Sequence, residues 1–333
     1  MNGSSSSTTT VRSVRKRSKP RSDIDLKPMS LDNSEEKKNM KSENGNNKPS
    51  KRCCLVSFEE LPEYMKDNEY ILNYYRADWP LKDAFFSLFR WHNETLNVWT
   101  HLLGFALFVG LMVGNLMDAT SPGMVTSAET SATQWPFFVF LCGSMFCLLS
   151  SSTCHLFACH SHDLNLWLLR MDYVGIAVMI ITSFFPPIFY IFQCEPLWQI
   201  VYLTGISVMG VFTIVTLLTP AFSTGKFRGF RAMLFVAMGL FGLIPAVHAV
   251  VVNWDESRRD VTLAYESVMA LSYLTGTAFY VMRIPERWKP GFFDLAGHSH
   301  QIFHVFVILG ALAHYGAALV FLEFRGKVGC NRT

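Results

Sequence analysis

Long stretches without Asp, Glu, Lys or Arg follow one another along the chain, separated by short charged connections. From Thr95 onward these charge-free runs cover residues 95–117, 130–162, 173–194, 196–225, 232–254, 267–282 and 295–322. A helix needs roughly 20 residues to cross the hydrocarbon of a bilayer, and a charge at its centre costs about 2.5–3.5 kcal/mol. All runs but the sixth exceed that length, and the sixth reaches it if its helix begins near Val261, with Glu266 in its first turns. The pattern therefore predicts an all-α membrane protein, a bundle of seven transmembrane helices.

Composition separates the N-terminal tail from the rest of the chain. The 333 residues are 50% hydrophobic and only 17% charged, against roughly 25% charged in soluble domains. Residues 1–52 hold 13 Lys/Arg and 6 Asp/Glu, a net charge of +7, and no aromatic residue. Such a stretch cannot bury enough apolar area to offset the entropy of ordering, so we expect a disordered basic tail. Nucleic-acid binding, which needs basic residues on a folded face with aromatic residues between them, is not indicated.

Lysine and arginine fall mainly on one side of the predicted bundle. The basic tail, the connections at 226–231 and 283–289 and Arg170 lie on that side, whereas residues 118–129 carry no Lys or Arg. Positive residues favour the cytoplasmic side, so we expect the N-terminus in the cytoplasm and the C-terminus outside, opposite to G-protein-coupled receptors. The chain then divides into a cytoplasmic tail (1–52), a cytoplasmic juxtamembrane amphipathic segment (53–94), the seven-helix domain (95–322) and a short outer tail (323–333).

The juxtamembrane segment mixes apolar and charged residues. Phe85, Phe86, Phe89 and Trp91 form an apolar cluster beside basic residues, which predicts a helix lying along the cytoplasmic interface. A small helix packed on the bundle fits the same pattern equally well. Cys53 and Cys54 at the start of the segment are candidates for palmitoylation.

Histidine and aspartate residues from three predicted helices converge on one membrane depth. His300 and His304 are four positions apart, which puts both imidazoles on one face of the seventh helix and suits a shared metal ion. Two such histidines alone are more often buried packing residues. His155 lies late in the second helix and Asp172 early in the third, so both reach the end where the seventh helix begins.

These residue types together point to zinc. Three imidazoles and a water form the tetrahedral set of a catalytic-type zinc site, and a nearby carboxylate holds that water or acts as its base. Imidazole with carboxylate favours zinc over magnesium or calcium. We therefore predict a Zn²⁺ site with His155, His300 and His304 as ligands and Asp172 acting through water.

Ser151 precedes His155 by one turn on the same face and is a tentative catalytic residue beside Asp172. The alternative is a hydrogen bond from its hydroxyl to its own helix, as serine often makes. Six other histidines are interpreted differently. His101, His248 and His314 are read as packing residues, and His298 points to another face of its helix than His300. His160 and His162 lie in a short turn, where a solvent-exposed loop residue and a metal ligand fit about equally well.

Five separated segments resemble, in order and spacing, the progestin and adipoQ receptor family. They are LPEYMKDNEYILNYYRADWP, FRWHNETLNVWTHLLG, SSSTCHLFACHS, MDYVGI and GHSHQIFHVFVILGALAHY, and the resemblance covers residues 55–322. It is strongest to the plant branch, the heptahelical transmembrane proteins. The resemblance implies the same zinc ligands, with Asp172 holding a water and Ser151 beside it, and a lipid-accepting cavity inside the bundle.

The resemblance implies a receptor-like protein in hormone or abiotic-stress (osmotic) signalling, with a membrane lipid in the cavity, either a fatty acid or a sphingolipid, and a signalling partner at the cytoplasmic region. The alternative function is a zinc-dependent lipid amide hydrolase of the ceramidase type. A third is a purely structural zinc that staples the helices. The sequence is compatible with location in the plasma membrane and with location in an endomembrane. A disulfide between Cys194 and Cys330 is a further possibility, and Asn93-Glu94-Thr95 is a formal glycosylation sequence on the cytoplasmic side.

Overall fold

The structure is a computed structural model that describes residues 54–119, 128–252 and 258–327. The predicted basic tail lies outside the described residues. So does Cys330, and its pairing with Cys194 stays a prediction.

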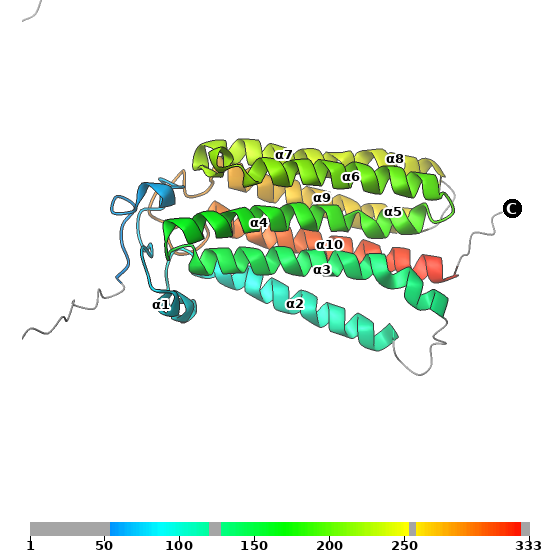
Figure 1. The fold of residues 1–333 in the computed structure, drawn as a ribbon, viewed down its shortest axis with the longest axis horizontal. Helices are drawn as coiled ribbons and strands as arrows, with labels where there is room; N and C mark the ends of the chain where they lie inside the picture. Colours follow the sequence, from blue (N-terminus) through cyan, green and yellow to red (C-terminus); the bar gives the residue numbers. More distant parts are fainter. Residues whose placement is uncertain (1–53, 120–127, 253–257, 328–333) are drawn as a thin grey trace, which may run out of the picture. The chain divides into compact units, whose positions relative to one another are not determined.

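Seven helical segments of membrane-spanning length run side by side in the described part of the chain (Figure 1). Two of them are made of two helices in line. The segments are α2 (Thr95–Ala119), α3 (Ala128–Phe157), α4 (His162–Ser183) with α5 (Phe185–Ile191), α6 (Pro196–Leu218), α7 (Arg228–Phe241) with α8 (Leu243–Val252), α9 (Arg259–Met282) and α10 (Ser299–Lys327).

Six of these segments are apolar enough to cross a membrane on length and composition alone. The exception is α9, which has 24 residues but carries Arg259, Asp260 and Glu266 in its first turns. The protein is thus a multi-pass integral membrane protein with a seven-transmembrane-helix bundle, as the charge-free runs predict.

Helix ends differ from the ends of the charge-free runs, and the difference is largest at the connection between α3 and α4. The second run extends to residue 162, but α3 ends at Phe157, and α4 begins at His162 rather than at residue 173. The charged residues Asp163 and Arg170 are therefore helical. An acidic residue in the first turn of a helix is favourable because it faces the positive end of the helix dipole, so charge ends the apolar run without ending the helix.

Prolines explain the two interrupted segments. Phe184 separates α4 from α5 and is followed by Pro186 and Pro187, while Gly242 separates α7 from α8 ahead of Pro245. A proline removes a helix hydrogen bond and its ring clashes with the carbonyl four residues earlier. Each segment therefore breaks within one turn before its proline and then continues in nearly the same direction (Figure 1).

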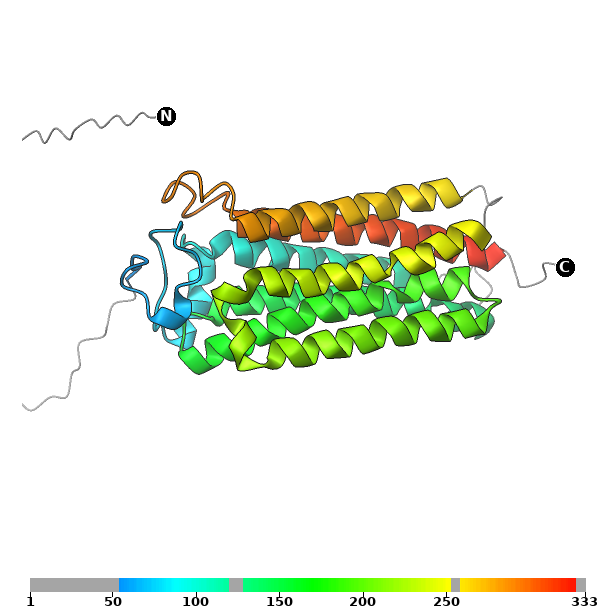
Figure 2. The ribbon, with the colours of Figure 1, turned by 90° about the horizontal axis from the view of Figure 1, so that it is seen from above.

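α9 packs along α10 through small residues (Figure 2). A Cβ added at Gly310 would lie 2.6 Å from the ring of Tyr273, and one added at Gly316 would lie 2.6 Å from the ring of Tyr265. Such small residues let membrane helices approach closely, and van der Waals packing then holds them together.

The juxtamembrane segment folds against the end of the bundle where α2 begins. It contains the 3-10 helices η1 (Glu63–Met65) and η2 (Ser87–Phe89) and the short helix α1 (Leu81–Phe86). Ala84 is buried on one side of α1, whereas the rings of Phe85, Phe86, Phe89 and Trp91 are exposed. The helix thus packs on the bundle and is apolar on its outer side, and its place along the membrane interface stays a prediction.

Arg76 ties this segment to α3. Its guanidinium donates to the carbonyl of His155 at 2.7 Å and to that of Leu156 at 2.9 Å, and only 2% of the residue is exposed. The last carbonyls of a helix have no partner within the helix, and a cation there also faces the negative end of the helix dipole. Arg76 therefore fixes the end of α3 that carries His155.

Candidate metal centre

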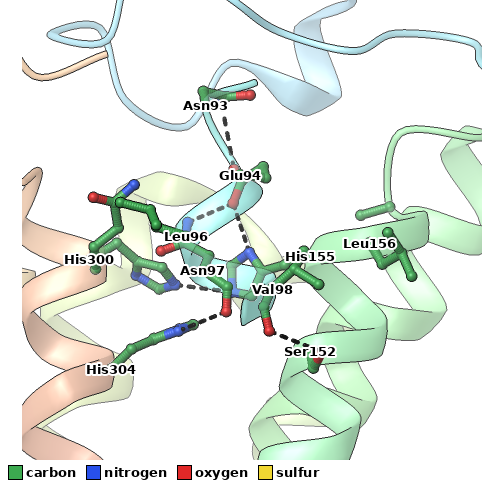
Figure 3. A network of polar contacts seen from close by, with 12 residues as sticks. Asn93, Glu94, Leu96, Asn97, Val98, Ser152, His155, Leu156, His300 and His304 are labelled. Carbon is green, nitrogen blue, oxygen red and sulfur yellow. Dashed lines mark hydrogen bonds and ion pairs between the residues drawn. The ribbon is translucent and has the colours of Figure 1, made fainter. Parts of the chain in front are cut away.

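Three histidines from two helices meet near the end of the bundle where α2 begins. Each of His155 on α3 and His300 and His304 on α10 offers a ring nitrogen, and the three nitrogens lie within 4.8 Å of one another. Nε2 of His155 and Nε2 of His300 are 3.1 Å apart and face each other (Figure 3). The structure therefore brings together the three residues that the sequence predicts as ligands.

Glu94 orients His155 from the other side of the ring. Its Oε2 lies 2.8 Å from Nδ1 of His155, and the amide of Asn97 also donates to it. An ionised carboxylate can only accept, so Nδ1 carries the proton and Nε2 presents its lone pair to the cluster. Burial alone would raise the pKa of the Glu94 carboxyl, but its contacts with His155 and Asn97 lower the pKa below the usual range.

His304 is oriented in the same way by α2. Its Nδ1 lies 3.2 Å from the carbonyl oxygen of Asn97 and 3.2 Å from Oγ1 of Thr100. The carbonyl can only accept, so Nδ1 donates to it and Nε2 keeps its lone pair. His101 packs flat on the same ring, with centroids 3.6 Å apart and an interplanar angle of 7°. His101 is thus a packing residue, as predicted, and the ring it packs on is that of His304.

Two observations are compatible with a metal ion such as zinc at the cluster. Two nitrogens bound at about 2.05 Å to tetrahedral zinc lie about 3.4 Å apart, against 3.1 Å between His155 and His300 and a limit of 4.8 Å for the whole group. Metal-binding histidines also typically donate their second ring nitrogen to a carboxylate or a backbone carbonyl, as His155 and His304 do here. The three histidines can therefore hold a metal ion, and imidazole ligands suit zinc as well as copper, iron and nickel.

Asp172 and Ser151 lie beside the cluster without belonging to the three-nitrogen group. Asp172 on α4 is 8% exposed, and the Ser151 hydroxyl lies within hydrogen-bonding range of its carboxylate. Both residues line the same cavity as the three histidines. Asp172 and Ser151 thus share a cavity with the cluster, and their roles toward a metal-bound water stay predictions.

A cavity of about 890 Å³ extends from the cluster through the interior of the bundle. Much of its wall is apolar, with Ile176, Met179 and Val307 among the lining residues. Arg231 on α7 also lines it near the cluster, with its guanidinium 4.9 Å from the centroid of the Tyr173 ring. The cavity thus combines an apolar interior with a cation and an imidazole cluster, which suits a molecule with a polar head and a hydrocarbon chain.

The remaining histidines have other partners. Nδ1 of His160 lies 2.8 Å from the carbonyl of Trp79, Nε2 of His298 lies 3.3 Å from that of Asn93, and His162 packs edge-on against the ring of Tyr64. His248 is 2.9 Å from the Tyr202 hydroxyl, and His314 is paired with Glu266.

Sequence reasoning missed Glu94, Asn97 and Thr100. The sequence Asn93-Glu94-Thr95 indicates a formal glycosylation acceptor and does not by itself indicate a role at the cluster. The available signal was position, since Glu94 is an acidic residue directly before a long charge-free run, at the membrane depth of the histidines.

Comparison with known proteins gives consistent matches across the bundle. A family model described as haemolysin-III related matches residues 89–315. Heptahelical transmembrane protein 1 of Arabidopsis thaliana is 65% identical over 291 residues, covering 85% of this chain and 86% of that protein. Heptahelical transmembrane protein ADIPOR1 of Oryza sativa subsp. japonica is 54% identical over 328 residues, covering 84% and 87%. The adiponectin receptor protein of Drosophila melanogaster is 36% identical over 263 residues, covering 78% of this chain and 58% of that protein.

Proposed function

The chain belongs to the haemolysin-III related family of heptahelical membrane proteins, and we propose that it is a receptor-like member with an intramembrane zinc site. The observation that carries this proposal is the position of the three-histidine cluster on the wall of a cavity of about 890 Å³. Ionisable residues inside a membrane bundle are functional by default because they are costly to bury there.

In this proposal His155, His300 and His304 hold the zinc, and Glu94 and Asn97 orient two of their rings. A zinc ion bound there supplies Lewis acidity at the end of the cavity. The acceptors at Nδ1 of His155 and His304 hold the proton on that nitrogen, so that Nε2 of each ring is free to bind the metal.

The proposed ligand is a membrane amphiphile, either a fatty acid or a sphingolipid. Its hydrocarbon chain would occupy the apolar part of the cavity, and its polar head would lie near the cluster and Arg231. One relative carries the name adiponectin receptor protein, and we propose a signalling role for this chain, in hormone or osmotic-stress responses, with its cytoplasmic region contacting a partner. N-in, C-out orientation is part of this proposal.

The second candidate function is hydrolysis of a lipid amide, and the place of Asp172 favours it. Asp172 is a buried carboxylate on the cavity wall beside the cluster, with Ser151 to hold it in place. Here a water molecule attacks the amide carbonyl while Asp172 accepts its proton and passes it to the departing amine. A zinc that only staples helices is less well supported, because such sites are closed on all sides and this cluster lines a cavity.

Metal analysis of purified protein tests the site. We expect about one zinc per chain, and the double variant His300→Ala/His304→Ala should lose it. His248→Ala, which removes a histidine bonded to Tyr202 away from the cluster, should keep its zinc. Full zinc content in the double variant would refute the proposed ligands.

Ceramide hydrolysis separates the two functions. If the chain is a hydrolase, Asp172→Ala should retain zinc and lose release of fatty acid from ceramide. Mass analysis of lipid that co-purifies with the wild type should find a fatty acid or a sphingolipid. A wild-type protein that holds zinc and lipid yet releases no fatty acid from ceramide would reject the hydrolase and leave the receptor.

A further inference from the structure

A pair of ionisable residues, a buried His314 and a Glu266 whose side chain is 26% exposed, joins α9 to α10 in the half of the bundle away from the histidine cluster. Nδ1 of His314 lies 3.1 Å and 3.3 Å from the two carboxylate oxygens of Glu266. The His314 side chain is 2% exposed, and both residues line the cavity described above. The cost of placing a carboxylate inside a membrane bundle makes such a pair a candidate functional site.

The pair leaves two buried polar atoms without a partner. The carboxylate can only accept, so Nδ1 of His314 carries a proton and donates to it. Neither Nε2 of His314 nor Oε1 of Glu266 has a hydrogen bond of good geometry among the described residues. A buried polar atom without a partner costs about 1–3 kcal/mol. What these two atoms lack is a hydrogen-bond partner.

A purely structural link between helices looks different in the same region. At the next position of α10, the hydroxyl of Tyr315 accepts from the side-chain amide of Asn115 on α2 at 2.8 Å. That amide also donates to the carbonyl of Leu111, and neither Asn115 nor Tyr315 lines the cavity. Glu266 and His314 differ on both counts, because they line the cavity and each leaves a polar atom without a partner.

We propose that Glu266 and His314 form a second polar station in the cavity, which binds a hydroxyl group on the chain of an amphiphile. The hydroxyl would donate to Oε1 of Glu266 or form a hydrogen bond with Nε2 of His314. The head of the same molecule would lie at the histidine cluster, so this inference rests on the proposed lipid-binding function and extends it to the substrate class.

The spacing of the two stations sets the position of that hydroxyl. His304 and His314 are ten positions apart on α10, which corresponds to about 15 Å along the helix. An extended carbon chain advances about 1.25 Å per atom with ordinary single-bond geometry. The two polar groups are therefore separated by about twelve carbon atoms, and the cavity wall includes the apolar residues Ile176, Met179 and Val307.

Binding of three fatty acids to the purified wild-type chain tests the proposal without any variant. The probes are stearic acid, 12-hydroxystearic acid and 2-hydroxystearic acid, measured by competition against a fluorescent fatty acid in detergent. We expect the 12-hydroxy acid to bind about tenfold tighter than stearic acid, because a hydrogen bond to a charged group is worth at least that factor. The 2-hydroxy acid should show no such gain, since its hydroxyl is beside the head.

Three variants assign the preference to the pair. Glu266→Leu and His314→Phe should each abolish the tenfold preference while keeping stearic acid binding and zinc content. Asn115→Leu, which breaks a polar link of α10 outside the cavity, should keep the preference.

The outcomes separate this inference from the function on which it rests. Equal binding of the three acids by the wild type, or a preserved preference in Glu266→Leu, would overturn the second station and leave the lipid cavity intact. Failure of all three acids to bind would refute the lipid-binding function itself, and the second station with it.

Discussion

Replacing Glu94 by alanine should weaken zinc binding by about 10- to 100-fold without removing any metal ligand. The carboxylate is the only described acceptor for Nδ1–H of His155, at 2.8 Å. Without it, the buried ring nitrogen loses its partner and the ring loses the charge that raises its basicity. The factor corresponds to about 1.4–2.8 kcal/mol of binding free energy.

The assay is a competition titration of purified protein with a zinc chelator of known affinity. Glu94→Gln keeps an acceptor oxygen and removes only the charge, so its affinity should fall between those of the wild type and Glu94→Ala. Glu63→Ala is the matched control, because Glu63 is a carboxylate in the same segment that is bonded to Lys66 and 88% exposed at its side chain. An alanine variant whose zinc affinity stays within about twofold of the wild type would refute the role of Glu94, since loss of the partner that orients a metal-binding histidine weakens binding by at least about tenfold.

Further variants test the fold around the site by thermal unfolding in detergent. Glu286→Ala removes the buried acceptor of the Ser299 backbone N–H at 2.8 Å and should cost about 1–3 kcal/mol; an unchanged midpoint would contradict this. Gly310→Leu should lower the midpoint because a Cβ there meets a tyrosine ring at 2.6 Å, whereas Gly114→Leu, with nothing within 4 Å, should not. Burial, and then nearby Arg76, lowers the pKa of His92 to about 3. The unfolded chain therefore binds this proton first, and stability should fall by about 2 kcal/mol between pH 6.5 and pH 5; a His92→Asn variant with the same slope would contradict this.

The seven helices could be predicted because one physical effect dominates their sequence. Charge is costly in hydrocarbon, so the apolar runs mark the spans. The ends of the helices could not be predicted in this way, because a helix continues into the interface where charge is tolerated. Asp163 and Arg170 end the apolar pattern and are nevertheless helical in α4.

The candidate site was predictable only in part for a related reason. His300 and His304 share a face through their spacing, and the antiparallel order of the spans brings His155 to the same depth. The partners of these rings are set by how α2 packs against α3 and α10, which no local pattern records. Glu94 and Asn97 therefore emerge only from the contacts in three dimensions.

The cluster joins residues from the start and the end of the bundle, and this orders events during biosynthesis. His155 and His300 are 145 positions apart, so a ribosome adding about 5–20 residues per second needs roughly 7–30 s to make the second ligand after the first. Until α10 has entered the membrane, His155 can contact Glu94 but has no second histidine beside it. If the cluster binds a metal ion as proposed, its capture is a late event that follows insertion of α10, and a product truncated before α10 lacks the site however well its first spans are folded.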